Sequence, residues 1–283
     1  MITKMTEKEL ENLIARALEE DVPQGDITSE SIIPEDSVSK AQILAKEEGV
    51  LAGLDVALMV FQHIDPSIYF DKKFKDGDKF KEGDVLAILE GKTISILKGE
   101  RIALNFLQRL SGIATLTNKF VEAVKGYNVK ILDTRKTTPC LRKLEKYAVR
   151  KGGGENHRMS LSDMVLIKDN HLVVVGSIRE AVERAREKVG DRLKIEVEVK
   201  NIEELKEAIE AGADIVMLDN MDISEIKKAV KIAKDEVFLE VSGKVTLDNV
   251  KKIAKTGIDF ISIGMLTHSY KSIDISLEIL KEE

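Results

Sequence analysis

Charged and polar side chains follow the short apolar segments in the second half of the sequence. Each segment ends in residues that could bind anions, bind cations or move protons. The clearest sets are Asp133-Thr-Arg-Lys, Lys168-Asp-Asn-His, Glu196 and Glu198 with Lys200, Asp219-Asn220, Ser242-Gly243 and Gly264. Solvation alone does not explain so many polar ends, because intervening helices already supply a polar face. We interpret these residues as one site assembled from many segments.

Positive charge is concentrated in one part of the chain. Between Lys130 and His171 there are ten Lys or Arg and five Asp or Glu, whereas the whole chain has a net charge of −6. This concentration predicts small anionic ligands rather than a polynucleotide. Guanidinium groups match carboxylates or phosphates, and ammonium groups suit phosphates as point charges. The candidates are Arg101, Arg135 and Arg158, and Lys136 and Lys168.

Two glutamates and a lysine alternate along one apolar segment. If this segment is a strand, Glu196, Glu198 and Lys200 face the same side. The carboxylates could bind Mg²⁺ or stabilise a developing positive charge, and Asp219 in the next segment can join them. A buried salt-bridge network is the alternative interpretation of Glu196 and Glu198.

Glycines mark two further candidate parts of the site. Gly152-Gly-Gly precedes His157 and Arg158, so a flexible segment delivers an imidazole and a guanidinium together. Ser242-Gly243 and Gly264 stand where two late strands would end, and barrels often bind phosphate there through backbone N–H groups.

The remaining histidines and the one cysteine differ in their expected roles. His171 and His268 lie in expected loops and could be ligands, whereas His63 lies in an apolar run and is expected to be structural. Cys140 follows Pro139 at a helix start, where a thiolate would be favoured, but without an evident base we expect it to be non-catalytic.

The elements that must position these residues fall into two regions. Thr6 and Glu9 form a capping box before a first helix. Residues 41–96 contain short strands separated by Gly-Asp turns, with one helix from Gly53 to Ile64. The second region alternates strands and helices, which predicts parallel pairing and favours a barrel. The expected strands are residues 129–132, 164–167, 194–199, 214–218, 237–241 and 259–263; helix starts are expected at Pro139, Ser177, Asn201, Ser224 and Thr246.

Composition limits the class of protein. The chain has 283 residues, 43% of them hydrophobic, and a single cysteine, which excludes an internal disulfide. It has no apolar run of signal-peptide or membrane-span length, so we expect a soluble, cytoplasmic protein. One third of the residues are charged and there is no Trp. This bias is typical of heat-adapted proteins and gives the hypothesis that the protein is thermostable, which a low melting temperature would refute.

The sequence resembles the quinolinate phosphoribosyltransferase family, also called nicotinate-nucleotide pyrophosphorylase (carboxylating), over nearly its whole length. The resemblance implies an α/β protein with an N-terminal α+β sandwich domain and an open, seven-stranded α/β barrel of the type II phosphoribosyltransferases. We predict the first domain at residues 1–108, the barrel at 109–268, and a C-terminal helix at about 269–283 that packs back on the first domain. The segments that carry the resemblance include Gly99-Glu-Arg-Ile-Ala-Leu-Asn, Asp133-Thr-Arg-Lys-Thr-Thr-Pro, Gly152-Gly-Gly-Glu-Asn-His-Arg, Leu166-Ile-Lys-Asp-Asn-His, Glu240-Val-Ser-Gly and Ile263-Gly-Met-Leu-Thr-His-Ser.

The resemblance also implies a reaction and its residues. Quinolinate and phosphoribosyl pyrophosphate would give nicotinate mononucleotide, pyrophosphate and CO₂ with Mg²⁺, in the biosynthesis of NAD. A homodimer is implied, in which each site is completed by its neighbour. The quinolinate-binding residues would be Arg135, His157, Arg158 and Lys168, with Arg101 from the partner subunit. Lys136, Glu198 and Asp219 would be catalytic, with Glu198 and Asp219 as metal ligands; Lys136, Ser242, Gly243, Gly264 and His268 would bind phosphoribosyl pyrophosphate.

The residues fit this chemistry without a nucleophile. Substitution at the anomeric carbon passes through a cationic sugar and an anionic leaving group, which require carboxylates near the sugar and cations near the pyrophosphate. The positively charged ring can accept the electrons released with CO₂, so the sequence assigns no residue to the decarboxylation. In two positions the chain departs from the family: Cys140 and Lys244 stand where glycine is common.

Three other interpretations remain at this stage. A barrel phosphoribosyltransferase could act on another substrate. A Schiff-base aldolase could use Lys168 or Lys200, although a site rich in cations lacks a clear base. The turns at Gly77-Asp78 and Gly83-Asp84 resemble those of lipoyl and biotinyl carriers, with Lys92 as the attachment site, but this interpretation leaves the barrel unexplained.

Overall fold

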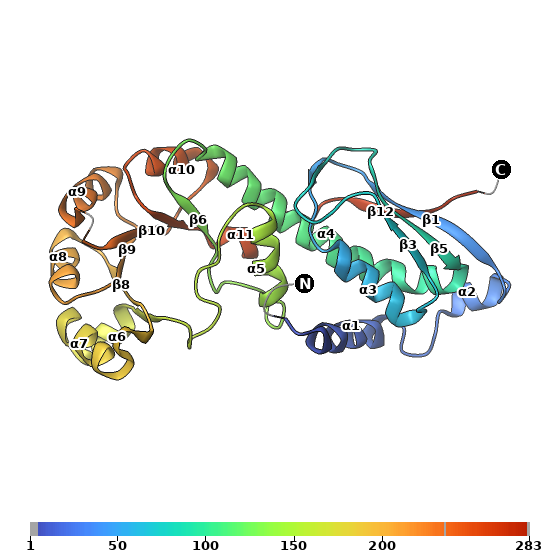
Figure 1. Ribbon diagram of the computed structural model, residues 1–283, viewed down its shortest axis with the longest axis horizontal. Coiled ribbons are helices and arrows are strands. Elements are labelled where there is room, and N and C mark those ends of the chain that lie inside the picture. The colour runs from blue at the N-terminus through green and yellow to red at the C-terminus, as the bar shows by residue number, and fades with distance from the viewer. Residues whose placement is uncertain (1–4, 235, 282–283) are drawn as a thin grey trace. The chain divides into compact units, whose positions relative to one another are not determined.

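The computed structural model describes residues 5–234 and 236–281 (Figure 1). These residues form two compact units that do not divide at a single point of the sequence. The first unit contains the described residues up to Asn118, Lys143–Gly153 and those from Tyr270 onward. The second unit contains Lys119–Arg142 and Gly154–Ser269. Among the described residues, no helix combines the length and apolar character needed to cross a bilayer.

The first unit is built on an antiparallel sheet of four strands in the order β12-β1-β5-β3. The strands are β1 (Val38–Ala45), β3 (Tyr69–Lys72), β5 (Val85–Lys92) and β12 (Ile275–Ile279), and a separate pair joins β2 (Gly49–Val50) to β4 (Lys79–Phe80). The helices are α1 (Glu7–Asp21), α2 (Ile27–Ile32), α3 (Leu54–Ile64), α4 (Thr93–Ala123), whose last residues belong to the second unit, and α5 (Arg142–Lys151).

Local sequence explains the helix starts in this unit. The predicted capping box is present, since Thr6 Oγ1 accepts from Glu9 N at 3.2 Å and Thr6 N donates to Glu9 Oε2 at 2.8 Å. α3 begins after Gly53, whose φ of +95° is accessible to glycine at little cost. The Asp76 carboxylate accepts from Gly53 N and Leu54 N at 2.8 and 3.0 Å, so a neighbouring loop caps this helix.

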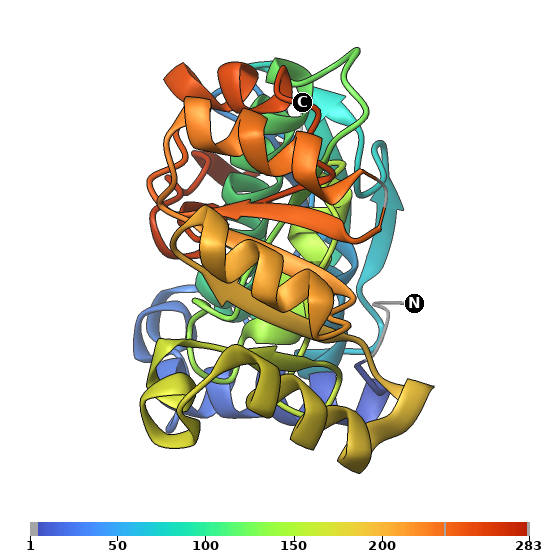
Figure 2. The ribbon, with the colours of Figure 1, turned by 90° about the vertical axis from the view of Figure 1, so that its left-hand side faces the viewer.

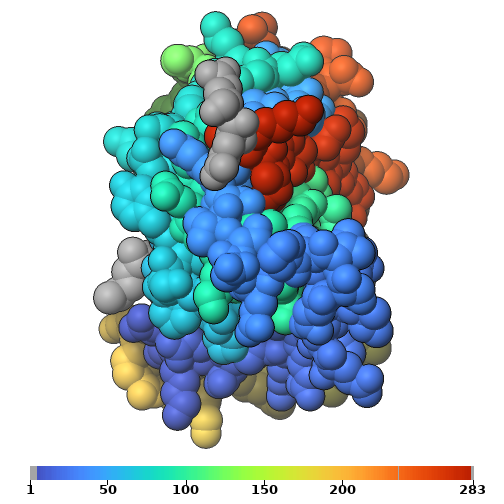
Figure 3. Space-filling model, turned by 90° about the vertical axis from the view of Figure 1, so that its right-hand side faces the viewer, coloured from blue at the N-terminus to red at the C-terminus, as the bar shows by residue number. Residues whose placement is uncertain are grey.

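The predicted C-terminal helix at about residues 269–283 is wrong. The described part of this segment contains the strand β12, which pairs antiparallel with β1 from Ala41↔Ile279 to Ala45↔Ile275. The reason is the alternation of Ile273, Ile275, Leu277 and Ile279 with polar residues, because a period of two predicts a strand. The surface of the first unit shows the red C-terminal segment against the blue N-terminal one (Figure 3).

The second unit is a parallel α/β sheet with the strand order β6-β11-β10-β9-β8-β7 (Figure 1). The predicted strand regions are all present, as β6 (Lys130–Leu132), β7 (Val165–Ile167), β8 (Ile195–Val199), β9 (Ile215–Asp219), β10 (Phe238–Ser242) and β11 (Phe260–Ser262). Helices and a 3₁₀ turn connect them: α6 (Asp169–Val175), α7 (Ile178–Val189), η1 (Gly190–Arg192), α8 (Ile202–Glu210), α9 (Ile223–Ala233), α10 (Leu247–Ala254) and α11 (Met265–His268). Figure 2 shows the helices α7, α8, α9 and α10 on the outer face of this sheet.

The barrel is open, and its described part has six paired strands rather than the expected seven. β6 and β7 form the two edges of the sheet. A seventh position beside β6 is reduced to the single parallel bridge Leu132↔Glu155, in which Glu155 N donates to Ile131 O at 2.8 Å. The chain leaves this position at once because Asp133 accepts from Asn156 Nδ2 and His157 N and so turns the next residues away from the ladder.

Polar N-cap residues begin the helices of the second unit. Ser177, Asn201 and Thr246 are N-caps, as their spacing predicts. α9 differs, because its N-cap is Asp222 rather than Ser224: Asp222 Oδ1 accepts from Ser224 N at 2.7 Å and Glu225 N at 2.9 Å. A carboxylate at this position also interacts favourably with the helix dipole.

Candidate active site

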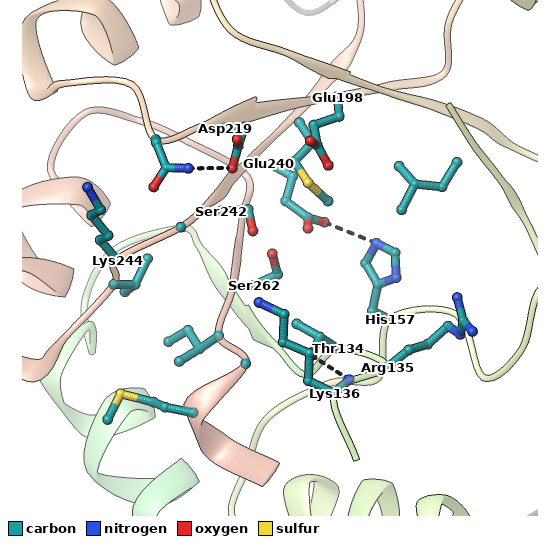
Figure 4. A pocket seen from close by; sticks show the side chains of 18 of the residues that line it. Thr134, Arg135, Lys136, His157, Glu198, Asp219, Glu240, Ser242, Lys244 and Ser262 are labelled. Carbon is teal, nitrogen blue, oxygen red and sulfur yellow. Dashed lines mark hydrogen bonds and ion pairs between the residues drawn. The ribbon is translucent and has the colours of Figure 1, made fainter. Parts of the chain in front are cut away.

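A cavity of about 750 Å³ lies at the carboxyl ends of the parallel strands (Figure 4). Its walls come from the second unit alone. Of the residues that sequence predicts for the site, the cavity brings together Arg135, Lys136, His157, Arg158, Lys168, Glu198, Asp219, Ser242, Gly243, Gly264 and His268. The convergence follows from topology, because parallel strands end at the same edge of the sheet. The predicted roles of these residues are not tested by their positions and remain predictions.

Arg101 is the predicted site residue that does not line this cavity. It belongs to α4 in the first unit, and its side chain is 58% exposed. Its Nη2 lies 3.9 Å from Glu100 Oε1. The expected role of Arg101 in a partner subunit's site therefore remains a prediction.

The cavity has opposite charges on opposite walls. In Figure 4, the Glu198 and Asp219 carboxylates lie on one side, Arg135 and Lys136 lie on the other, and the Glu240 carboxyl group lies between them beside His157. Such a cavity can hold a molecule with separate anionic and cationic regions, or an anion whose reaction develops positive charge.

Burial and mutual repulsion disfavour the charged form of the arginines on the basic wall. Burial and the neighbouring Arg135 charge lower the pKa of Arg158. Arg158 Nη1 donates to Met164 O at 3.1 Å, whereas the buried Arg135 Nε has no hydrogen-bond partner among the described residues. Two guanidinium groups held this close repel one another, so an anion between them would be bound strongly.

Lys168 links the basic and acidic walls. Lys168 directly follows β7, and its Nζ lies 3.3 Å from Glu198 Oε2. The Lys168 side chain is 44% exposed. An exposed, ion-paired ammonium is not the desolvated amine that a Schiff-base aldolase needs. Lys200 is also exposed, contacts Asp169 at 3.4 Å and is not among the residues that line the cavity. Neither lysine therefore supports the aldolase interpretation.

Glu198 and Asp219 present carboxylate oxygens from neighbouring strands. The Glu198 side chain is 13% exposed at the end of β8, and Asp219 ends β9, where its Oδ1 accepts from Asn220 Nδ2 at 2.9 Å. Oxygen ligands on a rigid sheet edge suit Mg²⁺, which usually keeps several waters and takes one or two protein carboxylates. These two residues therefore fit the predicted metal.

Glu196 is buried and bonded to His157. It is 0% exposed, and its Oε2 lies 2.9 Å from His157 Nε2. Burial raises the pKa of Glu196 to about 8. This contact agrees with the structural interpretation of Glu196, because the buried carboxyl group holds the imidazole at the cavity wall.

Sequence reasoning missed Glu240. This residue lies within the apolar strand β10, lines the cavity and is 1% exposed, and its Oε2 is 3.6 Å from His157 Nε2. The available signal was a glutamate two residues before Ser242 in an otherwise apolar segment. Because strand residues alternate, Glu240 and Ser242 face the same side.

The two glycines of the predicted phosphate site lie in close contact with neighbouring side chains. A side chain on Gly243, whose φ is +90°, would collide with the Asn220 amide. A Cβ on Gly264 would lie 2.9 Å from Lys136 Cδ and 3.1 Å from His268 Nε2. Each glycine thus lets the backbone approach the cavity closely.

The two departures from the family pattern occupy the left-handed region. Cys140 has a φ of +66° and Lys244 a φ of +47°, and both conformations favour glycine. Cys140 is exposed and is not among the residues that line the cavity, whereas Lys244 does line it. Lys244 therefore adds a cation beside the predicted phosphate loop.

The other histidines differ in their contacts and locations. His171 Nδ1 accepts from Lys168 N at 2.9 Å, which caps α6, and His171 is not among the cavity residues. His268 lines the cavity from α11, and its Nδ1 lies 2.6 Å from Ser269 Oγ. His63 lies in α3 of the first unit.

We expect Gly243→Ala to weaken binding of a phosphate group at the predicted phosphate loop. The added methyl group must displace Asn220 and adopt an unfavourable backbone conformation, which costs about 1–2 kcal/mol. Steady-state kinetics should show the KM for a substrate whose phosphate binds the predicted loop raised about tenfold. Gly212→Ala provides a matched control, because Gly212 also has a positive φ of +83° but has open space around its Cβ position. Equal effects of the two variants on KM would contradict the prediction.

Comparisons with known proteins all give the same family. Models of the quinolinate phosphoribosyl transferase N-terminal and C-terminal domains match residues 26–111 and 113–278. The chain is 45% identical to a probable nicotinate-nucleotide pyrophosphorylase [carboxylating] of Bacillus subtilis, over 97% of this chain and 95% of the relative. It is 46% identical to the protein of the same name in Methanocaldococcus jannaschii, over 95% and 96%. The crystal structure of NadC from Streptococcus pyogenes has 42% identity and a TM-score of 0.94, covering 99% of this chain and 100% of that one.

Proposed function

Because the chain belongs to the quinolinate phosphoribosyltransferase family, we propose that it transfers the phosphoribosyl group of phosphoribosyl pyrophosphate to quinolinate with loss of CO₂. The products are nicotinate mononucleotide and pyrophosphate, and the reaction serves the biosynthesis of NAD. The observation that carries this proposal is the cavity in which Arg135 and Lys136 lie opposite the carboxylates of Glu198 and Asp219.

The basic wall fits a diacid. Arg135, His157, Arg158 and Lys168 bind the two carboxylates of quinolinate and orient its ring nitrogen toward the sugar. The buried Arg135 Nε has no hydrogen-bond acceptor among the described residues. A carboxylate oxygen of the substrate would accept a hydrogen bond from it, which supports this role.

The remaining part of the cavity fits phosphoribosyl pyrophosphate. Lys136 binds the pyrophosphate as a point charge, and the 5'-phosphate lies against Ser242, Gly243, Gly264 and His268. Glu198 and Asp219 face the sugar, where negative charge stabilises the cation that develops at the anomeric carbon. They would also hold Mg²⁺, which neutralises the leaving pyrophosphate when bound.

The direct test is to mix the protein with quinolinate, phosphoribosyl pyrophosphate and Mg²⁺ and to measure nicotinate mononucleotide by chromatography. Nicotinate in place of quinolinate distinguishes a barrel phosphoribosyltransferase with another substrate, because it lacks the second carboxylate that the paired arginines would bind. Formation of product from nicotinate alone would overturn the proposal.

We further propose that the protein is a homodimer in which Arg101 enters the partner's site. Arg101→Ala and Lys136→Ala should each be nearly inactive, and the two variants mixed by joint refolding should recover about one quarter of the wild-type activity. Random pairing makes half of the dimers heterodimers of the two variants. In each heterodimer one of the two sites carries neither substitution, so one quarter of all sites are intact. Activity that does not rise on mixing would contradict a shared site, and size-exclusion chromatography with light scattering checks the dimer itself.

Cytoplasmic localisation and thermostability are also proposals. They rest on the single cysteine and on the charged composition. A melting temperature in the range of ordinary mesophilic proteins, about 45–65 °C, would overturn the second of these.

A further inference from the structure

The proposed reaction needs one proton at a defined atom. When the C2 carboxylate leaves the pyridinium ring as CO₂, the electron pair of the broken C–C bond stays on C2. The product carries hydrogen there, so one proton must reach C2 in every turnover. A side chain that is still protonated at neutral pH and lies in the substrate cavity is suited to supply it.

Glu240 has the required position. It reaches the cavity from the middle of β10, and Figure 4 shows its carboxyl group directed toward His157, which we place beside the quinolinate carboxylates. Its Oε1 is buried and has no hydrogen-bond partner among the described residues. An unsatisfied oxygen at a cavity wall is costly unless it carries a proton or meets a ligand.

The groups that face Glu240 come from four neighbouring segments. They are Glu196 on β8, Lys168 at the end of β7, the His157 ring in the loop before β7, and the Ser262 hydroxyl on β11. Burial and the like charge of Glu196 raise the pKa of Glu240 to about 8, although His157, Ser262 and Lys168 oppose the shift. Ser262 is close enough to contribute but completes no hydrogen bond of normal geometry.

Glu240 lies two strands away from Glu198, one of the two predicted metal ligands. Glu198 and Glu240 both pair in register with Met217 of β9, so a whole strand lies between them. Glu240 instead faces His157, whose Nε2 lies 2.9 Å from Glu196 Oε2 and 3.6 Å from Glu240 Oε2. These contacts fix the Glu240 carboxyl group beside His157.

We propose that the Glu240 carboxylic acid donates the proton that C2 of the ring takes up when CO₂ departs, an inference that rests on the proposed function. The O–H bond of Glu240 breaks as the C2–H bond forms, and the electron pair left on C2 becomes that bond. The Glu240 carboxylate then regains a proton from solvent before the next turnover. Glu196 is a positioning residue, because it holds His157 against Glu240.

The test separates the two halves of the reaction in a single turnover with quinolinate labelled in its C2 carboxyl carbon. Pyrophosphate and labelled CO₂ are measured in the same quenched samples. In Glu240→Gln, we expect pyrophosphate formation within about threefold of wild type, because the transfer step does not need the acid. CO₂ release should slow about 100-fold, and quinolinate mononucleotide should accumulate.

Glu145→Gln is the matched control. Glu145 is equally buried, but it pairs with Arg109 in the first unit. This control should lower stability without changing the ratio of CO₂ to pyrophosphate. Equal rates of the two products in Glu240→Gln, whether both are normal or both reduced, would overturn the inference. Absence of pyrophosphate in the wild type would instead overturn the proposed function.

The pH dependence of the wild type gives a readout that does not require the variant to fold. Below pH 8 the carboxyl group is mostly protonated, and CO₂ should appear together with pyrophosphate. Above pH 8 the donor is lost, so CO₂ should lag increasingly behind pyrophosphate, about tenfold per pH unit once the acid is mostly ionised. A ratio that stays constant between pH 6 and about pH 9.5 would overturn the inference.

Discussion

Replacing Glu198 with Gln should lower the turnover number by about 100- to 1,000-fold while changing the KM for quinolinate little. The variant keeps the shape of the side chain and removes its negative charge. That charge is held at the end of β8, where only 13% of the side chain is exposed. A fixed carboxylate in a partly desolvated cavity stabilises the cationic sugar of the transition state more than it stabilises the ground state.

Two measurements distinguish this role from simpler ones. Glu203→Gln removes an exposed carboxylate from the adjacent helix α8 and should leave turnover unchanged. If Glu198 acted only by holding Mg²⁺, a large excess of the metal would restore most of the lost rate. We expect little recovery, and retention of near-full turnover by Glu198→Gln would contradict the assignment outright.

The fold could be predicted from the sequence where the pattern is local and repeated. All six parallel strand regions lie where apolar segments with turn signals place them, because a buried strand between amphipathic helices has a composition unlike either neighbour. The C-terminal strand β12 was missed, although its apolar residues alternate. Its partner β1 is more than 200 residues away in the sequence, so no local feature indicated that an edge of the first sheet was open to it.

The candidate site was predictable for a topological reason. Residues that follow parallel strands come to one edge of a sheet whatever the loop lengths, and eleven of the predicted side chains and glycines accordingly line one cavity. Arg101 could be predicted only from the family resemblance, because it lies in a long helix of the other unit.

The interior contacts of the site could not be predicted. Glu196 and His157 are 39 residues apart, and Glu240 is further still, yet all three meet at the same place. A glutamate within an apolar strand indicates a special environment, but sequence does not show which partner satisfies it. The raised pKa of Glu240 depends on that environment and therefore emerges only from the structure.

Replacing Lys136 with Ala should lower kcat/KM for phosphoribosyl pyrophosphate about 1,000-fold. Lys136 lines the cavity, and the structure records no ion pair for its ammonium group among the described residues. Its backbone is held on both sides, since Lys136 N donates to Thr134 Oγ1 at 3.0 Å and Lys136 O accepts from Thr267 Oγ1 at 2.7 Å. An unneutralised cation on so fixed a backbone is placed to meet the charge that develops on the leaving pyrophosphate.

Variants at the same position separate charge from geometry. Lys136→Arg keeps the charge but is larger, and Gly264 lies against the Lys136 stem, so we expect only partial activity, about 10-fold below wild type. Lys130→Ala, which removes an exposed lysine paired with Glu155 on the same stretch of chain, should have no effect on kcat/KM.

Quinolinate binding, measured by calorimetry in the absence of the second substrate, should be nearly unchanged in Lys136→Ala. A loss of quinolinate affinity as large as the loss of kcat/KM would place Lys136 at the diacid instead, and the division of the cavity into two anion-binding regions would have to be abandoned.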